Sequence, residues 1–236
     1  MKDKSPHLSR EVQSFLHEIL VVLKMETTTL EQPQVKRNAK RKAIPKELIY
    51  EMARGRPLYY RDYKKVLTGE KCVEEIMGSS ALQGEFIALL VGMLMSKLDL
   101  RKYVVMTNEI GFIYAPKSWR ILDIAIFDRK KVQHERGTTK YVKTAPKVVI
   151  EVDTKADVKN YGDILGYLTE KTDDLLNAGV ETVIWILTET HKVCVAEQGK
   201  PWILAKWTDA IPVVEGVTMQ VDQLIKQMSA TEGGNL

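Results

Sequence analysis

The stretch PKVVIEVDTK, Pro146 to Lys155, decides the fold, because it reads as a buried β-strand that carries ionisable groups. Side chains in a strand alternate between the two faces of a sheet with a period of two. This alternation places Glu151, Asp153 and Lys155 on one face. Two carboxylates and an amine on one face of an apolar strand are costly to bury unless something pairs them. A metal ion, a phosphate, or the groups themselves would do so.

A further carboxylate lies inside a second strand, predicted from about Arg120 to Phe127 in SWRILDIAIFDRKK. There Asp123 interrupts a run that is apolar on both faces. The loop between the two strands is long enough for a return connection, which favours an antiparallel pair. A helix follows from about Ile164 to Ala178, and Lys171 falls at the edge of its apolar stripe. We therefore expect Lys171 to lean over the sheet that carries both acidic strands.

This set of residues is the minimum for metal-assisted phosphodiester hydrolysis. Asp123, Glu151 and Asp153 offer the oxygen ligands that a hard divalent cation, Mg²⁺ or Mn²⁺, prefers. A nearby lysine, either Lys155 or Lys171, can orient or deprotonate a metal-bound water and stabilise charge on a phosphate. From spacing alone, a structural ion pair between one carboxylate and one lysine is an equally open interpretation.

Other segments predict a mixed domain of strands and helices. The run from Leu48 to Tyr63 predicts two short strands around a glycine-proline turn. The strongest helix runs roughly from Ser80 to Leu98, and its apolar residues nearly encircle it, which predicts a core helix. Tyr103 to Ala115 predicts two strands, or one strand bent at Gly111. Two later strands between Lys192 and Trp207 predict a hairpin.

Composition bounds the class of protein. The chain has 236 residues, of which 44% are hydrophobic, enough for one large domain or two small ones. Its net charge of +4 is compatible with a polyanionic partner. Cys72 and Cys194 fit a reducing compartment with free thiols. No apolar run approaches the roughly 20 residues that span a membrane. We therefore expect a soluble cytoplasmic protein without a membrane association.

The order and spacing of these pieces resemble the Uma-two family, a branch of the PD-(D/E)XK nuclease superfamily. The resemblance runs from about Pro45 to Gln227. It implies an α/β (α+β) fold with a restriction-endonuclease-like mixed central β-sheet flanked by helices. The matching segments, in family order, are LIYEMARGRPLYYRDYKKVLTGEKCVEEIMGSSALQ, TNEIGFIY, WRILDIAIFD, APKVVIEVDTK, KTDDLLNAGVETVIWI and VVEGVTMQVDQL.

The resemblance also implies roles for particular residues. Asp123 matches the aspartate of the PD element, although the proline before it is absent, and Glu151 matches the acidic (D/E) position. Asp153 stands where the superfamily has its lysine. In this family that lysine is thought to have moved to the following helix, where Lys171 lies. The resemblance also allows a second alignment with the superfamily motif, in which Asp153, Thr154 and Lys155 match D-x-K and Lys155 is the motif's lysine.

The leading hypothesis is a Mg²⁺- or Mn²⁺-dependent DNA endonuclease. Enzymes of this size that cut both strands often act as symmetric pairs, so we expect a homodimer. The alternative is a catalytically inactive nuclease-fold module that binds nucleic acid or an unknown protein partner. Residues 1–46 are expected to form an N-terminal helix and a basic linker, residues 47–230 the nuclease-like domain, and residues 231–236 a disordered tail. Met25 is an alternative start of the chain.

Overall fold

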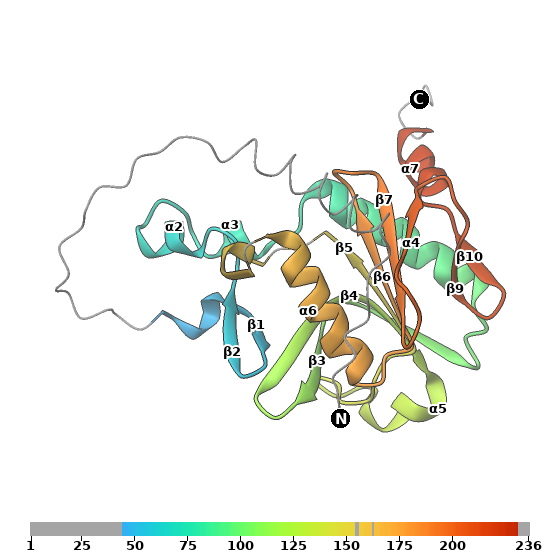
Figure 1. Ribbon diagram of the computed structural model, residues 1–236, viewed down its shortest axis with the longest axis horizontal. Coiled ribbons are helices and arrows are strands. Elements are labelled where there is room, and N and C mark those ends of the chain that lie inside the picture. Colours follow the sequence, from blue (N-terminus) through green and yellow to red (C-terminus); the bar gives the residue numbers. More distant parts are fainter. Residues whose placement is uncertain (1–43, 154–155, 162, 231–236) are drawn as a thin grey trace.

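A mixed β-sheet forms the centre of the molecule (Figure 1). The structure, a computed structural model, describes residues 44–153, 156–161 and 163–230. The predictions for the N-terminal helix, nearly all of the basic linker, Lys155 and the C-terminal tail lie outside these residues. The sheet has the strand order β2-β1-β4-β5-β6-β7-β8, and β3 pairs with β4. Strands β5 and β6 run parallel, and the other pairs in this sheet are antiparallel.

The bounds of the elements agree closely with the predicted periodicity. The strands are β1 (Ile49–Ala53), β2 (Arg56–Tyr59), β3 (Tyr103–Ala115), β4 (Ser118–Asp128), β5 (Val148–Val152), β6 (Thr182–Leu187), β7 (Lys192–Glu197), β8 (Ile203–Lys206), β9 (Ile211–Val214) and β10 (Val217–Met219). The helices are η1 (Lys46–Leu48), α2 (Tyr63–Leu67), α3 (Glu74–Met77), α4 (Ala81–Lys97), α5 (Arg129–Val132), η2 (Gln133–Glu135), η3 (Val158–Tyr161), α6 (Ile164–Asn177) and α7 (Val221–Ala230).

Helices cover both faces of the sheet, which confirms the predicted fold class. In Figure 1, α6 lies across one face and α4 lies behind the sheet on the other. On the α6 face, Val149 packs in one hydrophobic cluster with Leu175 and Trp185. On the α4 face, Ile150 packs in a second cluster with Leu90. Alternate side chains of β5 therefore belong to the two hydrophobic clusters, as expected for a strand that is buried on both faces.

Helix α4 is buried along a single stripe, so the prediction of a core helix holds for one side of it only. Phe86, Leu90 and Leu94, spaced four residues apart, face the sheet. In contrast, Leu82 is 53% exposed and Met95 is 44% exposed. An apolar composition that nearly encircles the helix predicted a core helix, yet the described part of the chain covers one face only.

The segment from Tyr103 to Ala115 is one long strand, β3, and it bends at a bulge. The bulge lies at Asn108 and Glu109, not at Gly111 as predicted, and both residues have positive φ angles of 72° and 58°. The pairing with β4 shifts between Thr107 and Ile110. Gly111 instead allows a close approach, because a Cβ there would lie 2.4 Å from the ring of Tyr141.

Strand β4 shares one edge with two different strands, and this positions the site described below. Strand β3 pairs along one edge of β4 over its whole length. On the other edge, β1 pairs at Trp119 and β5 pairs from Ile124 to Ile126. Between these two pairings, β1 and β5 diverge and leave a gap beside residues 120–123 of β4. We call this gap the fork.

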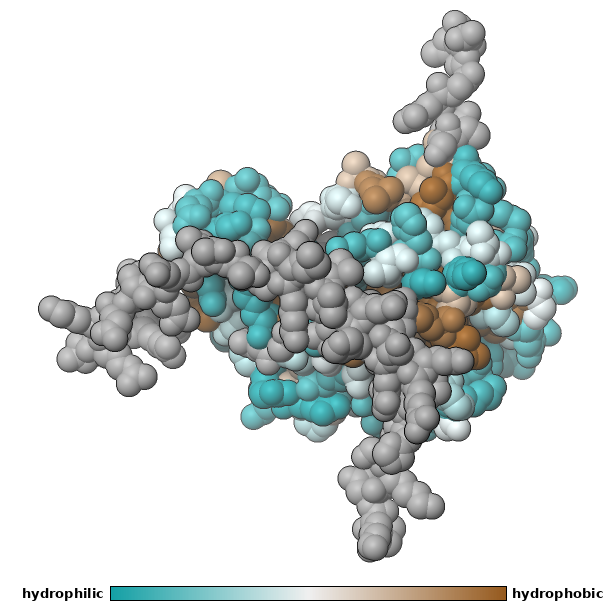
Figure 2. Space-filling model, turned by 45° about the horizontal axis from the view of Figure 1, so that its top comes forward, coloured by the Kyte–Doolittle hydropathy of each residue, from teal (hydrophilic) through white to brown (hydrophobic). Residues whose placement is uncertain are grey.

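The described surface on the face shown in Figure 2 is mainly hydrophilic, with hydrophobic patches, one of them beside α7. Within the described ranges, every helix is too short or too polar to cross a membrane.

Candidate active site

At the fork, charged side chains form the hydrogen bonds that main-chain groups of β4 and β5 would otherwise make with a neighbouring strand. The N–H of Ile121 donates to Glu51 Oε1 at 3.0 Å, and its carbonyl accepts from Lys171 Nζ at 2.6 Å. At the other side of the fork, Val152 N donates to Asp123 Oδ2 at 2.8 Å. Three side chains from β1, α6 and β4 therefore take the place of strand partners, which buried peptide groups require.

Lys171 lies at the centre of this arrangement and is 1% exposed. Besides the carbonyl of Ile121, its Nζ lies 2.9 Å from Glu151 Oε2 and 3.1 Å from Glu51 Oε1. Burial lowers the pKa of Lys171, but Glu151 and Glu51 outweigh it, so that the pKa lies well above its ordinary value. Lys171 is therefore held as a cation between two glutamates.

Glu151 has one oxygen engaged and one unused. Its Oε2 accepts from Lys171, whereas its Oε1 is buried and has no hydrogen-bond partner among the described residues. Burial raises the pKa of Glu151 well above its usual range, and the charges of Asp123 and Glu51 add to this effect, while Lys171 opposes it. A buried carboxylate oxygen without a partner is costly. The unused oxygen therefore suits a cation or a water.

Asp123 lies next to Glu151 in the sheet and also borders a cavity. Their strands are antiparallel neighbours, paired at Ile124 and Ile150. Asp123 is 6% exposed and lines a cavity of about 430 Å³ together with Glu109. The bulge in β3 lies directly opposite Asp123, between the pairings of Thr107 and Ile110. The irregular strand thus makes room beside this carboxylate.

The donor set at the fork fits a magnesium-type cation. Within the described residues, no group of three or more His, Cys, Asp or Glu side chains could hold a metal ion. Mg²⁺, however, is usually held by one or two carboxylates while it keeps several waters. Asp123 and the unused oxygen of Glu151 match that requirement, and Asp123 opens toward the cavity.

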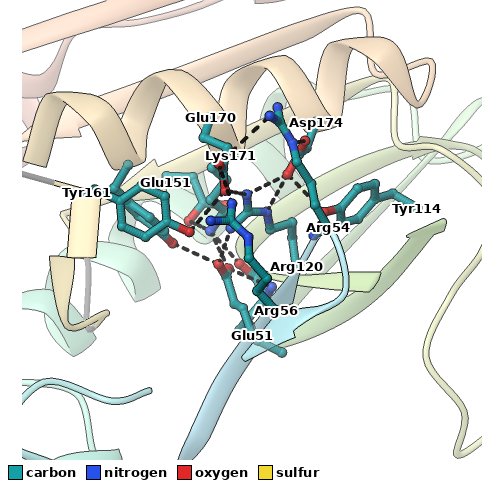
Figure 3. A network of polar contacts seen from close by, with 12 residues as sticks. Glu51, Arg54, Arg56, Tyr114, Arg120, Glu151, Tyr161, Glu170, Lys171 and Asp174 are labelled. Atoms are coloured by element: carbon teal, nitrogen blue, oxygen red, sulfur yellow. Dashed lines mark hydrogen bonds and ion pairs between the residues drawn. The ribbon is translucent and has the colours of Figure 1, made fainter. Parts of the chain in front are cut away.

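A second set of ion pairs supports the centre from the side of α6. Arg120 is fully buried and donates to Glu51 Oε2 at 2.9 Å and to Asp174 on α6. Figure 3 shows this network between α6 and the strands. Its four carboxylates and four cations are Glu51, Glu151, Glu170, Asp174, Arg54, Arg56, Arg120 and Lys171. The balance of charge makes burial of the interior pairs possible.

Asp153 does not join Glu151, and the predicted common face for these two residues is wrong. Strand β5 ends at Val152, and Asp153 has a left-handed φ of 54°, which turns its side chain away from the strand alternation. Its carboxylate accepts from Thr188 N at 3.0 Å and from Thr188 Oγ1 at 2.6 Å. Asp153 lines a different cavity, on the side of Phe86 and the α4 face.

Two central residues, Glu51 and Arg120, were not predicted from the sequence. Each is a charged residue inside an apolar strand, which is the same signal that singled out Asp123. Applied to every predicted strand, that criterion finds both. Glu51 and Arg120 pair with each other, and their other partners, Lys171 and Asp174, lie on α6, far along the chain, so only the fold brings them together.

Comparisons with known proteins support the fold. No family model matches the sequence, and no curated protein matches it. The structure is similar to a crystal structure from Anabaena variabilis ATCC 29413, that of a candidate nuclease belonging to DUF820, with a TM-score of 0.54 and 12% sequence identity. The match covers 75% of this chain and 89% of that chain. At this identity the similarity establishes a shared fold, a mixed sheet flanked by helices.

Proposed function

We propose that this protein is a divalent-metal-dependent nuclease and a diverged member of the Uma-two group. The observation that carries the proposal is the placement of Asp123 and Glu151 on adjacent strands, each next to the paired residues Ile124 and Ile150, with one buried Glu151 oxygen left without a partner among the described residues. A fold shared with a candidate nuclease of DUF820 supports it. The proposed reaction is Mg²⁺- or Mn²⁺-dependent hydrolysis of phosphodiester bonds within DNA.

Each residue at the fork has a separate part in this proposal. Asp123 and Glu151 would hold the cation, which when bound supplies an activated water and charge stabilisation at a phosphate. Lys171 fixes the orientation of Glu151 by bonding Oε2, so that Oε1 stays available. Glu51 in turn holds Lys171. Because its pKa is raised, Lys171 contributes positive charge rather than accepting a proton from water.

DNA would be held by surface lysines and arginines, so its binding should weaken steeply with salt. The small net positive charge of the chain agrees with an anionic substrate. Lys155, the alternative lysine, lies outside the described residues.

The test is cleavage of plasmid DNA with Mg²⁺ or Mn²⁺ by the wild type and by the variants Asp123→Asn and Glu151→Gln. We expect each variant to lose about 100-fold or more of the activity, because each removes one charged ligand of the cation. The matched control is Glu74→Gln, an exposed glutamate on α3. Equal residual cleavage in all four preparations would show that the activity comes from elsewhere.

A second candidate is a catalytically inactive nuclease-fold module that binds nucleic acid or a protein. One observation favours it: the ammonium group of Lys171 donates to the carbonyl of Ile121 and to Glu151 and forms an ion pair with Glu51, as in a purely structural ion-pair cluster. Calorimetric titration with Mn²⁺ separates the two candidates. A sub-millimolar site that disappears in Glu151→Ala favours the enzyme, and the absence of heat in the wild type favours the binding module.

A further inference from the structure

The segment that joins β4 to β5, residues 129–147, carries an excess of exposed positive charge. Glu135 is its one acidic residue, and its carboxylate is used inside the segment, where it accepts from the N–H groups of Lys143 and Thr144. Five basic residues of the segment are exposed, and none of them forms an ion pair with another described residue: Lys130, Lys131, Arg136, Lys140 and Lys143. A surface with charge of one sign attracts a polyanion.

Part of this basic segment is fixed against β3. The N–H of Val142 donates to the carbonyl of Gly111 at 2.9 Å, and the carbonyl of Val142 accepts from the N–H of Ile113 at 2.9 Å. Val142 is also buried and belongs to the hydrophobic cluster on the α6 face. Lys140 and Lys143 are therefore held at defined positions on either side of this anchor.

Between these two lysines, Tyr141 lies flat on Gly111. A Cβ at Gly111 would lie 2.4 Å from Cγ and Cδ1 of the Tyr141 ring and 2.5 Å from Cδ2. Because these three distances are nearly equal, that position lies above the face of the ring, and any residue larger than glycine would displace the ring. Tyr141 is nevertheless 47% exposed, so its opposite face is open to solvent. The ring of Trp119 stands beside it, with an interplanar angle of 68° and 6.2 Å between the ring centroids.

We propose that Tyr141 stacks on an unpaired base of single-stranded DNA, while Lys140 and Lys143 bind the phosphates on either side of that base. Proteins that bind single strands combine aromatic rings, on which bases stack, with positive charge that follows the backbone. An exposed tyrosine by itself needs no such explanation, but here a glycine is required beneath the ring, and exposed lysines flank it. A base within a duplex is covered on both faces and would first have to leave the stack. The partner is therefore a strand with unpaired nucleotides.

The Tyr141 ring lies near the candidate active site. Gly111 pairs directly with Ile121 of β4, two positions before Asp123. Directly paired residues share a face of a sheet, as do residues two positions apart along a strand. Glu109, which lines the same cavity as Asp123, is two positions from Gly111 along β3. DNA bound at Tyr141 would therefore pass close to that cavity. This placement rests on the proposed function and gives its substrate class, DNA with a single-stranded segment, whereas binding of the strand is measured without cleavage.

The test measures binding of fluorescein-labelled oligo(dT) to the full chain by fluorescence anisotropy, with EDTA present so that no strand is cut. Tyr141→Ala should weaken binding about tenfold, the effect typical of losing one stacked base. Tyr141→Phe should bind as the wild type does, because stacking needs the ring and not the hydroxyl group. A matched abasic strand separates the base from the phosphates. The wild type should bind it about tenfold more weakly than oligo(dT), whereas Tyr141→Ala should bind both strands equally.

The lysines are tested through the salt dependence of the same binding. Lys140→Gln and Lys143→Gln should each reduce the slope of log K against log salt concentration by about 0.7, the value for one phosphate contact on a single strand. Lys206→Gln, at an exposed residue of the edge strand β8, is the matched control and should leave the slope unchanged.

Gly111→Ala provides an independent disruption, because it displaces the Tyr141 ring without removing it. It should weaken binding to oligo(dT) as much as Tyr141→Ala does, and the double variant should bind no more weakly than either single variant. Because Tyr141 is exposed, Tyr141→Ala should keep the wild-type melting temperature, so that its loss of binding does not reflect unfolding.

Any of three results would overturn the proposal: a wild type that does not bind oligo(dT) at low salt, a wild type that binds oligo(dT) and the abasic strand equally, or a Tyr141→Ala variant that binds oligo(dT) as the wild type does. Plasmid cleavage by the Asp123→Asn variant is measured separately. If oligo(dT) binds as expected but Asp123→Asn cuts as well as the wild type, the proposed function fails and the strand-binding surface is retained.

Discussion

At the scale of single residues, Lys171 shows how a buried charge can be tolerated. Its ammonium group donates to the carbonyl of Ile121 on β4 and to Glu151 on β5, and it forms an ion pair with Glu51 on β1. Removing an ion from water costs several kcal/mol, and the loss is recovered only when geometry and hydrogen bonding are nearly complete. The lysine therefore depends on both glutamates, and one of them, Glu51, also serves Arg120.

Removal of the charge of Glu51 should be strongly destabilising. In Glu51→Gln, Arg120 and Lys171 stay buried with one carboxylate fewer between them. We expect the free energy of unfolding to fall by about 3 kcal/mol or more, the cost of breaking a buried pair. Urea denaturation of the variant measures it, with Glu74→Gln as a surface control that should stay within about 0.5 kcal/mol of wild type. A change in Glu51→Gln no larger than the control would mean that the ion pairs contribute little.

At the scale of elements, the parts predicted well were those with a local cause. Helix α6 begins after Asp163, whose Oδ1 accepts from Gly166 N at 2.8 Å, and it ends before Gly179, whose φ is +99°. Such caps and the hydrophobic periodicity are visible in the sequence itself. The antiparallel neighbours β4 and β5 were likewise predictable from two apolar runs and a long connection.

The predictions failed where a single backbone angle, or a contact with a residue far along the chain, determines the position or the partner of a side chain. The left-handed φ of Asp153 moves its carboxylate to Thr188, and no period-two pattern shows such an angle in advance. Glu51 acquires its role from Lys171, 120 positions later, and from the sheet order that places β1 beside β4. The candidate site was therefore half predictable: its strands and helix were expected, and its innermost partner was not.

The cap of α6 should contribute a measurable share of the stability. In Asp163→Ala, the N–H of Gly166 loses its acceptor at the first turn. We expect a loss of about 1 kcal/mol in the free energy of unfolding, typical of such caps. Chemical denaturation provides the value, and Ser80→Ala, which removes the matching cap of α4, should cost a similar amount. A loss in Ser80→Ala alone would show that the start of α6 is held by other contacts.

The loop after α5 should respond to pH through Glu135. Its carboxylate accepts from the N–H of Lys143 at 2.8 Å and from that of Thr144. Burial raises the pKa of Glu135, but these hydrogen bonds lower it by more, so the net shift is downward. A carboxylate with a depressed pKa stabilises the folded state above its unfolded pKa of about 4.3, and this stabilisation is lost as the pH falls through the folded value.

Glu135→Gln should therefore be less stable than wild type at pH 7, and the difference should shrink as the pH falls below about 4. Urea denaturation at a series of pH values tests the sign. A difference that grows toward low pH would contradict the assignment of the hydrogen bonds.

At the scale of the whole molecule, the candidate cation should act as a ligand of the folded state. Because Asp123 and Glu151 come from two strands that unfolding separates, an unfolded chain offers no such site. Mn²⁺ at one hundred times its dissociation constant would add about 2.7 kcal/mol to the free energy of unfolding. For a chain of this size, that corresponds to a rise of about 5–10 °C in melting temperature.

Differential scanning calorimetry with and without Mn²⁺ measures this rise. The rise should vanish in Glu151→Gln and persist in Glu74→Gln. If the melting temperature of the wild type does not change with Mn²⁺, the result would favour the inactive binding module over the enzyme.

The fork at β4 also restricts how this sequence can change over evolution or in design. An ordinary buried ion pair can often be exchanged for two apolar residues at little cost. Here the pair Glu51–Lys171 also satisfies the N–H and the carbonyl of Ile121. Two apolar replacements would leave both peptide groups unsatisfied. Positions 51 and 171 are therefore expected to accept only residues that keep an acceptor and a donor there, whether or not the protein retains any catalytic activity.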